Sequence, residues 1–320
     1  GARLREVDWS QGDYPTDAVL AAITPQTGLI AIVSPNNPTG AVATVADLKR
    51  VAEAAPNAVI LLDQAYAEFA DDALTRAALE LQNVIVVRTL SKAWGLAGLR
   101  VGYAIAPTAV APILRAVGQP YAVAAPSIAL ATAALQEPGV MLEYVARISE
   151  ERELLENLLR ELQLDPLPSQ GNFILARPSD PAWLRDGLAG QGIGIRIWPD
   201  DPKLAGCARV TCPGDESDWN RLSRALCTVV KPEAILFDMD GVLVDVSASY
   251  RIAIQQTAAS FGVTLSDEEI AAAKDAGNAN DDWALTYKLL QERGVSVSLK
   301  EVTSCFERLY QGEPGKAGLR

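Results

Sequence analysis

Residues 1–120 repeat one rhythm, in which a short apolar run is followed by a turn and then by a helical pattern. The apolar runs occupy residues 28–33, 58–62 and 84–87. Unbroken apolar runs of this kind are typical of strands buried on both faces. Between the first two runs, residues 44–55 have apolar positions at helical spacing, with Thr44 placed as the N-cap. This βαβ pattern predicts a parallel sheet that binds ligands at the carboxyl ends of its strands.

The rest of the chain divides into a mixed α/β segment and a helical segment. A helix is predicted over residues 139–164, because Pro166 bars its continuation. A smaller α/β unit follows, with strands predicted at residues 173–176, 193–197 and 208–212 and helices at residues 181–189 and 216–229. A further apolar strand is predicted at residues 234–237. Beyond residue 247 the pattern is helical, with breaks near Gly262, Gly277 and Gly294.

Composition excludes several classes of partner. A chain of 320 residues suggests roughly two domains. The formal net charge is −12 and the pI is near 4.6, so no basic stripe is present to bind nucleic acid or an anionic membrane. The longest apolar stretch, residues 121–135, is interrupted by Pro126 and is too short to cross a bilayer. No signal-peptide pattern begins the chain, and we expect a cytoplasmic protein.

The residue types available for chemistry are also restricted. Histidine is absent, which excludes Ser-His and Cys-His nucleophile pairs and histidine-ligated zinc. The four cysteines form no C-x-x-C pair, so neither a zinc site nor a redox motif is supported, and a reduced setting is expected. Any catalysis must therefore use Lys, Asp, Tyr, Arg or a cofactor.

Three polar motifs directly follow the three predicted strands. They are residues 34–40 (SPNNPTG), 63–66 (DQAY) and 89–92 (TLSK), and Arg100 comes shortly after the third. Together they supply a lysine, an aspartate, a tyrosine, an asparagine, hydroxyls and an arginine. This set matches what pyridoxal 5'-phosphate needs: a lysine for its aldehyde, a carboxylate for its pyridinium nitrogen, and hydroxyls with an arginine for its phosphate.

These motifs resemble those of the fold-type I pyridoxal-phosphate aminotransferases, specifically the histidinol-phosphate aminotransferase family. The resemblance covers residues 1 to about 230 and is carried by SPNNPTG, by LLDQAYAEF and by RTLSKAWGLAGLRVGY at residues 88–103. It implies that Lys92 is the Schiff-base lysine and the proton shuttle. The remaining cofactor contacts that it implies are Asp63 with the pyridinium, Asn37 and Tyr66 with the ring hydroxyl, and Ser91, Arg100 and more weakly Thr89 with the phosphate.

Further motifs resemble the small domain of the same family. They are residues 169–173 (SQGNF), 194–196 (GIR) and 209–211 (RVT). The resemblance implies that Arg209, with Asn172, holds the substrate α-carboxylate and that Arg196 faces the substrate phosphate. It also implies a homodimer. The chain departs from the family after Arg209, where residues 210–215 read VTCPGD and predict a reshaped turn.

A second candidate site lies near the end of the chain. Residues 234–245 (AILFDMDGVLVD) read as a buried strand that ends in D-x-D-G. The carboxylates of Asp238 and Asp240 could share Mg²⁺, which prefers hard oxygen ligands. The motif resembles motif one of the haloacid dehalogenase superfamily of phosphatases, which implies that Asp238 is a nucleophile and Asp240 an acid/base. Asp281 and Asp282 open a predicted helix and are interpreted as part of a cap.

The expected fold class is therefore α/β, in three parts. Residues 1–137 are expected to form an N-terminally incomplete aminotransferase large domain, residues 138–231 an interdomain helix and small domain, and residues 232–320 the first strand and helical cap of a phosphatase domain. The expected reaction is imidazole-acetol phosphate plus glutamate giving histidinol phosphate plus 2-oxoglutarate. Two alternatives stay open: a threonine-phosphate decarboxylase-like enzyme, and a catalytically incomplete fragment.

Overall fold

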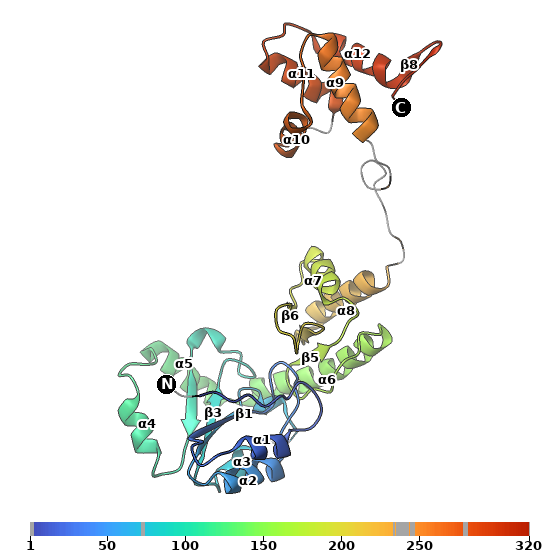
Figure 1. Cartoon of the computed structure of the whole chain (residues 1–320). Coiled ribbons are helices and arrows are strands. Elements are labelled where there is room, and N and C mark those ends of the chain that lie inside the picture. The colour runs from blue at the N-terminus through green and yellow to red at the C-terminus, as the bar shows by residue number, and fades with distance from the viewer. Residues whose placement is uncertain are drawn as a thin grey trace. The chain divides into compact units, whose positions relative to one another are not determined.

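The computed structural model describes residues 3–71, 74–232, 234, 243, 247–277 and 281–319 (Figure 1). Contacts within the chain divide it into two compact units, Gly1–Glu233 and Ala234–Arg320. Among the described residues, no helix is long and apolar enough to cross a membrane.

The first unit contains a four-stranded sheet whose order follows the sequence. Its strands are β1 (Leu29–Val33), β2 (Val59–Asp63), β3 (Val84–Thr89) and β4 (Gly102–Ile105). The first three strands are parallel, as predicted, and β4 is antiparallel to β3. In register, Val33 pairs with Asp63 and Asp63 pairs with Val87. The carboxyl ends of β1, β2 and β3 therefore meet at one edge of the sheet.

Burial of the sheet corrects one expectation. The apolar runs predict strands buried on both faces, but Leu29 of β1 is 61% exposed and burial along β2 alternates from residue to residue. On the buried face, Ile32, Ile60 and Val86 pack against helix α2 (Val45–Ala54). The prediction is wrong for β1 because β1 is an outer strand of this sheet, paired on one side by β2.

Helix α2 begins where the sequence predicts. The Thr44 hydroxyl accepts a hydrogen bond from the Asp47 backbone N–H at 3.1 Å, and the Asp47 carboxylate accepts one from the Thr44 N–H at 2.9 Å. This reciprocal capping box satisfies two backbone donors that a helix start otherwise leaves unpaired.

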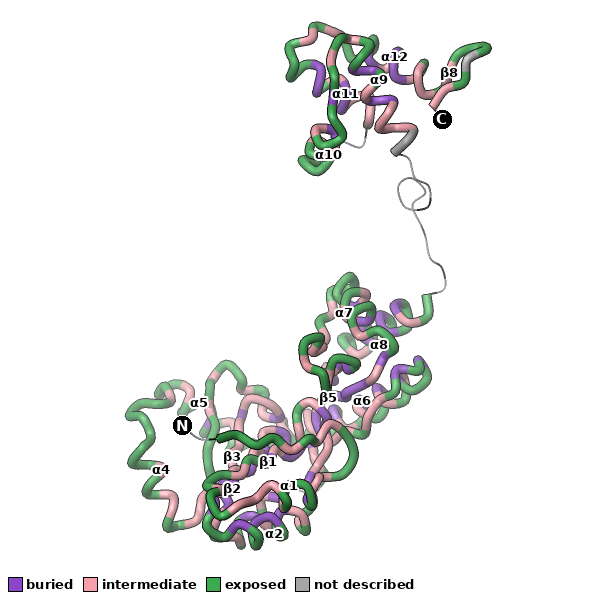
Figure 2. Tube along the Cα trace, in the orientation of Figure 1, coloured by how far each residue is buried: buried purple, intermediate pink, exposed green. Residues whose placement is uncertain are grey.

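Helices and short turns make up the rest of the first unit as far as its smaller sheet. They are α1 (Thr16–Ala22), η1 (Ala67–Phe69), α3 (Thr75–Ala78), η2 (Ala97–Leu99), α4 (Ala111–Val117), α5 (Ala125–Gln136) and α6 (Gly139–Glu161). Figure 2 shows α4 and α5 as largely exposed. Large apolar side chains on these two helices, including Ile113, Val117, Ile128 and Leu130, are more than half exposed.

Helix α6 ends three residues before the predicted position. The N–H of Leu164 donates to the carbonyl of Leu159 at 2.9 Å, and the N–H of Gln163 donates to that of Arg160 at 3.0 Å. Gln163 has φ of 59°. This is a Schellman closure, which satisfies the last carbonyls and ends the helix before Pro166 can do so.

A three-stranded antiparallel sheet forms the smaller part of the first unit. Its order is β5 (Phe173–Ala176), β7 (Ala208–Thr211) and β6 (Arg196–Ile197). Helices α7 (Pro181–Gly190) and α8 (Glu216–Val230) pack with α6 around its buried strands. The predicted elements are confirmed within one residue, except that the predicted strand at residues 193–197 is shortened to β6.

The second unit is helical, as predicted. Its elements are η3 (Ser247–Arg251), α9 (Ile252–Ser260), α10 (Asp267–Asp275), α11 (Asp282–Glu292), α12 (Leu299–Gln311) and a hairpin of β8 (Gly312–Glu313) and β9 (Lys316–Ala317), which the sequence did not predict. Gly262, Gly277 and Gly294 have φ between 77° and 85° and separate the helices, which confirms the predicted breaks. The predicted strand at residues 234–237, apart from residue 234, lies outside the described residues.

Candidate functional site

The strand ends bring several predicted site residues to one edge of the larger sheet. Asp63 is the last residue of β2, and its Oδ1 accepts a hydrogen bond from the Ala65 N–H at 2.9 Å. The Asn37 loop follows β1 and the Lys92 loop follows β3. Polar side chains in successive loops at this edge are the arrangement that the βαβ pattern predicts.

Lys92 and Tyr66 lie in contact. The Lys92 Nζ is 5.1 Å from the centre of the Tyr66 ring, which is a cation–π contact. The Tyr66 side chain is buried and packs edge-on against Phe173 of β5, with ring centres 5.2 Å apart. Among the described residues Lys92 forms no ion pair, so its amine is not neutralised by a neighbouring carboxylate.

Arg209 continues this line of contacts from the smaller sheet. Its guanidinium carbon lies 5.0 Å from the centre of the Phe173 ring, and its Nη1 donates to Asn37 Oδ1 at 2.6 Å. Its Nε is buried and has no hydrogen-bond partner in the described part of the chain. The structure thus joins Lys92, Tyr66, Phe173, Arg209 and Asn37 in one series of contacts. Phe173 was not predicted as a site residue, although it ends the SQGNF motif.

Arg196 stands directly beside Arg209 on the smaller sheet. The two are Cα partners across the antiparallel pair β6 and β7, so their side chains share one face. The Arg196 guanidinium carbon also lies 5.7 Å from the centre of the Trp198 ring. Like charges directly opposite each other destabilise a sheet, and an anion bound between them removes that repulsion.

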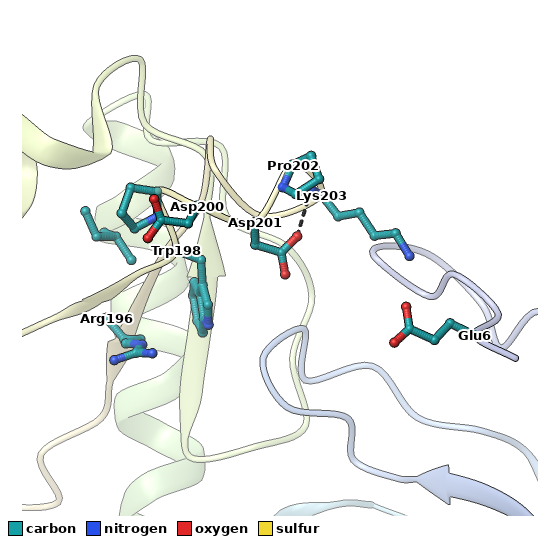
Figure 3. A pocket seen from close by; sticks show the side chains of 9 residues that line it. Glu6, Arg196, Trp198, Asp200, Asp201, Pro202 and Lys203 are labelled. Atoms are coloured by element: carbon teal, nitrogen blue, oxygen red, sulfur yellow. Dashed lines mark hydrogen bonds between the residues drawn. The ribbon is translucent and has the colours of Figure 1, made fainter. Parts of the chain in front are cut away.

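An open cavity of about 750 Å³ adjoins Arg196. Figure 3 shows Arg196 and Trp198 along one wall, with Asp201, Lys203 and Glu6 farther across. Asp201 Oδ1 accepts a hydrogen bond from the Lys203 N–H at 2.9 Å. The cavity therefore offers both signs of charge and an aromatic face, and no resemblance had assigned these lining residues other than Arg196.

Asn172 contacts a different group of residues. Its side chain hydrogen-bonds Tyr144 of α6, and among the described residues Arg209 bonds Asn37 and not Asn172. Burial raises the pKa of the Tyr144 hydroxyl, and Cys212 and Glu151 contribute to the same direction. Burial, together with the Glu151 charge, raises the pKa of the Cys212 thiol to about 12. Cys212 is therefore an inert thiol rather than a nucleophile.

The predicted reshaped turn is tied to α6. The Glu151 carboxylate accepts the Gly214 N–H at 2.6 Å, and Arg147 Nη1 donates to the Gly214 carbonyl at 3.0 Å. Burial raises the pKa of Glu151, although the Gly214 N–H and Arg147 act in the opposite direction. Gly214 has φ of 75°, and a Cβ there would overlap the Tyr144 ring. The turn after β7, which follows Arg209, is thus fixed by three residues of one helix.

Arg152 connects the two sheets and was missed by sequence reasoning. Its Nη1 donates to the carbonyl of Phe69 at 3.1 Å and to that of Gly171 at 3.0 Å. Phe69 follows Tyr66 in η1, and Gly171 precedes Asn172. An arginine within a regular amphipathic helix has no local sequence signal for such a role.

The predicted phosphate ligands are only partly brought together. The Thr89 hydroxyl donates to Ser91 Oγ at 2.9 Å, and the Ser91 N–H donates to Thr89 Oγ1 at 3.1 Å. Arg100 is exposed, and its Nη1 donates to the Ala97 carbonyl of its own loop at 3.1 Å. No described contact joins Arg100 to Ser91.

The second candidate site cannot be placed, because Asp238 and Asp240 lie outside the described residues. Among the residues that are described, no group of three or more acidic or cysteine side chains is arranged to hold a metal. Asp282 begins α11 and forms an ion pair with Lys274 at 2.8 Å.

Comparisons with known proteins agree with the geometry of the first unit. The profile of aminotransferase class I and II matches residues 2–226. The chain is 37% identical over 221 residues to a histidinol-phosphate aminotransferase from Thermoanaerobacter pseudethanolicus, and this match covers 68% of the chain and 60% of that relative. The chain thus spans about 60% of the length of this relative.

Solved structures give the same result for the fold. A histidinol-phosphate aminotransferase from Sinorhizobium meliloti in complex with pyridoxal-5'-phosphate is 28% identical, with a TM-score of 0.63, over 72% of this chain and 65% of that one. An L-threonine-O-3-phosphate decarboxylase from Porphyromonas gingivalis is 23% identical, with a TM-score of 0.58, over 68% of this chain and 69% of that one.

Proposed function

Because the chain belongs to the aminotransferase class I and II family, we propose that its first unit binds pyridoxal 5'-phosphate at Lys92 and transfers an amino group to a phosphorylated ketone, as a histidinol-phosphate aminotransferase does. The observation that carries the proposal is the series of contacts from Lys92 through Tyr66 and Phe173 to Arg209 and Asn37. It joins a lysine amine to an arginine that retains an unpartnered donor, Nε.

The residues present fit the cofactor by their chemistry. Lys92 supplies an amine without an ion-pair partner in the described residues, and Asp63 supplies a carboxylate at the same sheet edge for the pyridinium nitrogen. Tyr66 and Asn37 would contact the ring hydroxyl, and Ser91 with Thr89 would hold the phosphate. Arg100 would have to leave the Ala97 carbonyl to join them. When bound, this cofactor withdraws electrons from the substrate α carbon.

The protein's own residues then have separate tasks. The Lys92 amine, once free, can accept a proton from the substrate α carbon and return it elsewhere. Asp63 keeps the pyridinium nitrogen protonated by pairing with its N–H. Arg209 would bind the α-carboxylate with Asn172, which must exchange its contact with Tyr144 to do so. Arg196, beside Arg209, would bind the phosphate of the ketone or the side-chain carboxylate of a donor such as glutamate.

We extend the proposal to a homodimer in the cytoplasm. Support for an interface comes from the number of large apolar side chains that α4 and α5 expose within a short stretch of chain, since exposed apolar surface of this kind can mark a contact with another protein. The four cysteines are unpaired, which suits a reducing compartment.

The main test is covalent binding of pyridoxal 5'-phosphate. The purified chain mixed with this compound should show a visible absorption band that borohydride abolishes, with the added mass located on the Lys92 peptide. Lys92→Ala should lose the band and the added mass completely, because the amine that bonds the aldehyde is gone. Lys49→Ala, which removes an exposed lysine of α2, should lose neither.

A chain without a lysine-dependent band would contradict cofactor binding and would favour the reading of a catalytically incomplete fragment. If the band forms, imidazole-acetol phosphate and glutamate are the first substrates to test. The likeness in fold to the threonine-phosphate decarboxylase supports a second candidate. Release of carbon dioxide from threonine phosphate, without amino transfer, would favour that candidate.

For the second unit we propose the N-terminal part of a haloacid dehalogenase-like phosphatase that uses Mg²⁺ bound by Asp238 and Asp240. Support comes from the sequence AILFDMDGVLVD and from the chemistry of two carboxylates, which suit a hard cation. The test is release of inorganic phosphate from histidinol phosphate by the longest available form of the protein. Release should require Mg²⁺ and stop in Asp238→Asn, and release that persists in this variant would reject the assignment.

A further inference from the structure

A buried polar network lies beside the predicted cofactor residues, and we call it the Arg88 network: Gln64, Glu68, Thr75 and Arg88. Arg88 Nη2 donates to Glu68 Oε1 at 2.8 Å, and Arg88 Nη1 donates to the Thr75 hydroxyl at 2.8 Å. The Thr75 hydroxyl in turn donates to Gln64 Oε1. The Arg88 guanidinium of β3 therefore bonds η1 and α3 directly and, through Thr75, the residue that follows β2.

The network is buried and only partly satisfied. The side chains of Arg88 and Glu68 are 14% and 10% exposed. Arg88 Nε and Glu68 Oε2 are buried and have no hydrogen-bond partner among the described residues. A bidentate pair, in which the guanidinium donates two parallel hydrogen bonds to the carboxylate, would satisfy both of these atoms. Arg88 instead makes one bond to Glu68 and uses its other terminal nitrogen for Thr75.

Three of the four members of the network adjoin a residue of the predicted site. Gln64 follows Asp63, Glu68 is in the turn that follows Tyr66, and Arg88 is on the strand that leads to Lys92. Arg88 and Thr89 are consecutive in β3, so their side chains point to opposite faces. Arg88 thus reaches the η1 side, while Thr89 bonds Ser91 next to Lys92.

We propose that Arg88 and Glu68 are positioning residues that hold the Tyr66 turn against the Lys92 loop. The inference rests on the proposed function only in the test that measures binding of pyridoxal 5'-phosphate to Lys92. The 5.1 Å contact between Lys92 Nζ and the Tyr66 ring is the geometry that the network sets. A forked guanidinium is needed because it must donate to Thr75 and Glu68 in different directions at once.

A purely stabilising role makes a different prediction. A buried ion pair often contributes no more stability than a pair of apolar side chains, whereas removing one partner leaves an uncompensated buried charge. The double variant Glu68→Gln/Arg88→Met removes both charges and should regain much of the stability that each single variant loses. It does not restore the directional link between the two loops. In the double variant, stability should therefore recover while the position of Lys92 relative to Tyr66 should not.

Two readouts at Lys92 test the proposal in the full chain. The first is modification of the Lys92 peptide by pyridoxal 5'-phosphate and borohydride, which should fall on the order of tenfold or more in Arg88→Met and in the double variant. The second is trace acetylation of Lys92 relative to Lys49, which needs no cofactor. It should rise about threefold, which corresponds to the loss of one cation–π contact. Arg88→Lys, which keeps the charge but not the fork, should give intermediate values.

The matched control is Leu48→Ala, which creates a cavity in the apolar core that packs on the same sheet, at an apolar side chain that takes no part in the hydrogen bonds of the network. It should lower the unfolding temperature without changing either Lys92 readout in the folded chain. Acetylation that follows unfolding temperature across all variants, including Leu48→Ala and the double variant, would overturn the inference. Failure of the unchanged chain to bind pyridoxal 5'-phosphate would count against the proposed function alone, because acetylation decides the inference independently.

Discussion

The two compact units keep their polar side chains in different places. Among the described residues, the first unit buries Gln64 and Glu151 almost fully and encloses the Glu68–Arg88 ion pair. In the described part of the second unit the fully buried polar side chains are two threonines, Thr257 and Thr286. Two of its described carboxylates, those of Glu269 and Glu301, instead stand at exposed helix starts, where they complete capping boxes.

This difference shows in which unit the fold brings polar side chains together in a buried site. Burying a polar group costs free energy unless hydrogen bonds replace its water. The first unit meets that cost at strand ends and loops, where side chains from distant segments converge on Lys92 and Arg209. The described helices of the second unit pair their charged groups mainly at the surface, in capping boxes such as that of Ser266 with Glu269 and in ion pairs between helices such as Arg293 with Glu269. Its proposed chemistry therefore depends on Asp238 and Asp240 rather than on the helical part.

The largest expected effect is a loss of stability, and it comes from substituting one of two matched glycines by alanine. Gly214 and Gly262 both have left-handed backbones, with φ of 75° and 79°. Alanine costs about 1 kcal/mol at either position for the backbone alone. At Gly214 its Cβ would also overlap the Tyr144 ring, whereas nothing lies within 4 Å at Gly262. We expect Gly214→Ala to destabilise the first unit by about 3 kcal/mol in all.

Hydrogen exchange measured by mass spectrometry, peptide by peptide, separates the two units in this experiment. Gly262→Ala is the control and should raise exchange in the second unit alone, by the smaller amount. Equal losses of stability for the two substitutions would show that the turn after β7 is as loosely packed as the turn at Gly262 between α9 and α10. The contrast between the two units would then be wrong for these turns.

A smaller effect on stability is expected at two of the capping boxes, one from each unit. Thr44→Ala removes the N-cap of α2 in the first unit, and Ser298→Ala removes that of α12 in the second. Each should cost about 1 kcal/mol, because the lost hydrogen bond is the same in kind. Denaturant unfolding followed by hydrogen exchange in each unit checks this. A loss in one unit that spreads undiminished to the other would contradict their independence.

Features set by neighbouring residues were predictable from the sequence, and features set by distant contacts were not. The Thr44 cap and the breaks at Gly262 and Gly277 depend on a few adjacent residues. The exposure of Leu29 depends on which strands lie beside β1. The Schellman end of α6 requires Gln163, not a glycine, to adopt a left-handed backbone, and no local signal marks it.

The candidate site likewise contains residues that local sequence predicts and residues that only distant contacts bring in. The strand-end motifs located Asp63, Tyr66 and Lys92 because parallel strands align their carboxyl ends. The hydrogen bond between Asn37 and Arg209 joins residues far apart in the chain, and only the family resemblance pointed to both. Residues such as Arg152 and Glu151 act through backbone groups, which leave no residue-type pattern to read.

The smallest expected effect is a difference between the two units in how the free energy of unfolding changes with pH. Burial raises the pKa of Glu151, so its neutral form is favoured by folding. Its contribution to stability is present below about pH 4.5 and is lost as pH rises through the folded pKa. Hydrogen bonds from the Ser298 side chain and backbone lower the pKa of Glu301, so its contribution is present above that pH and is lost as pH falls through its folded pKa.

Glutamine variants isolate the two contributions. The stability of the unchanged chain minus that of Glu151→Gln should fall with rising pH in the first unit, and the same difference for Glu301→Gln should rise in the second. Denaturant unfolding of each unit between about pH 4 and pH 7 measures both slopes across the range where glutamates titrate. Slopes of the same sign would mean that Glu151 is held as a carboxylate by Gly214 and Arg147, so that its hydrogen bonds outweigh its burial. The polar groups of the first unit would then be buried with their charge, as the Glu68–Arg88 pair is.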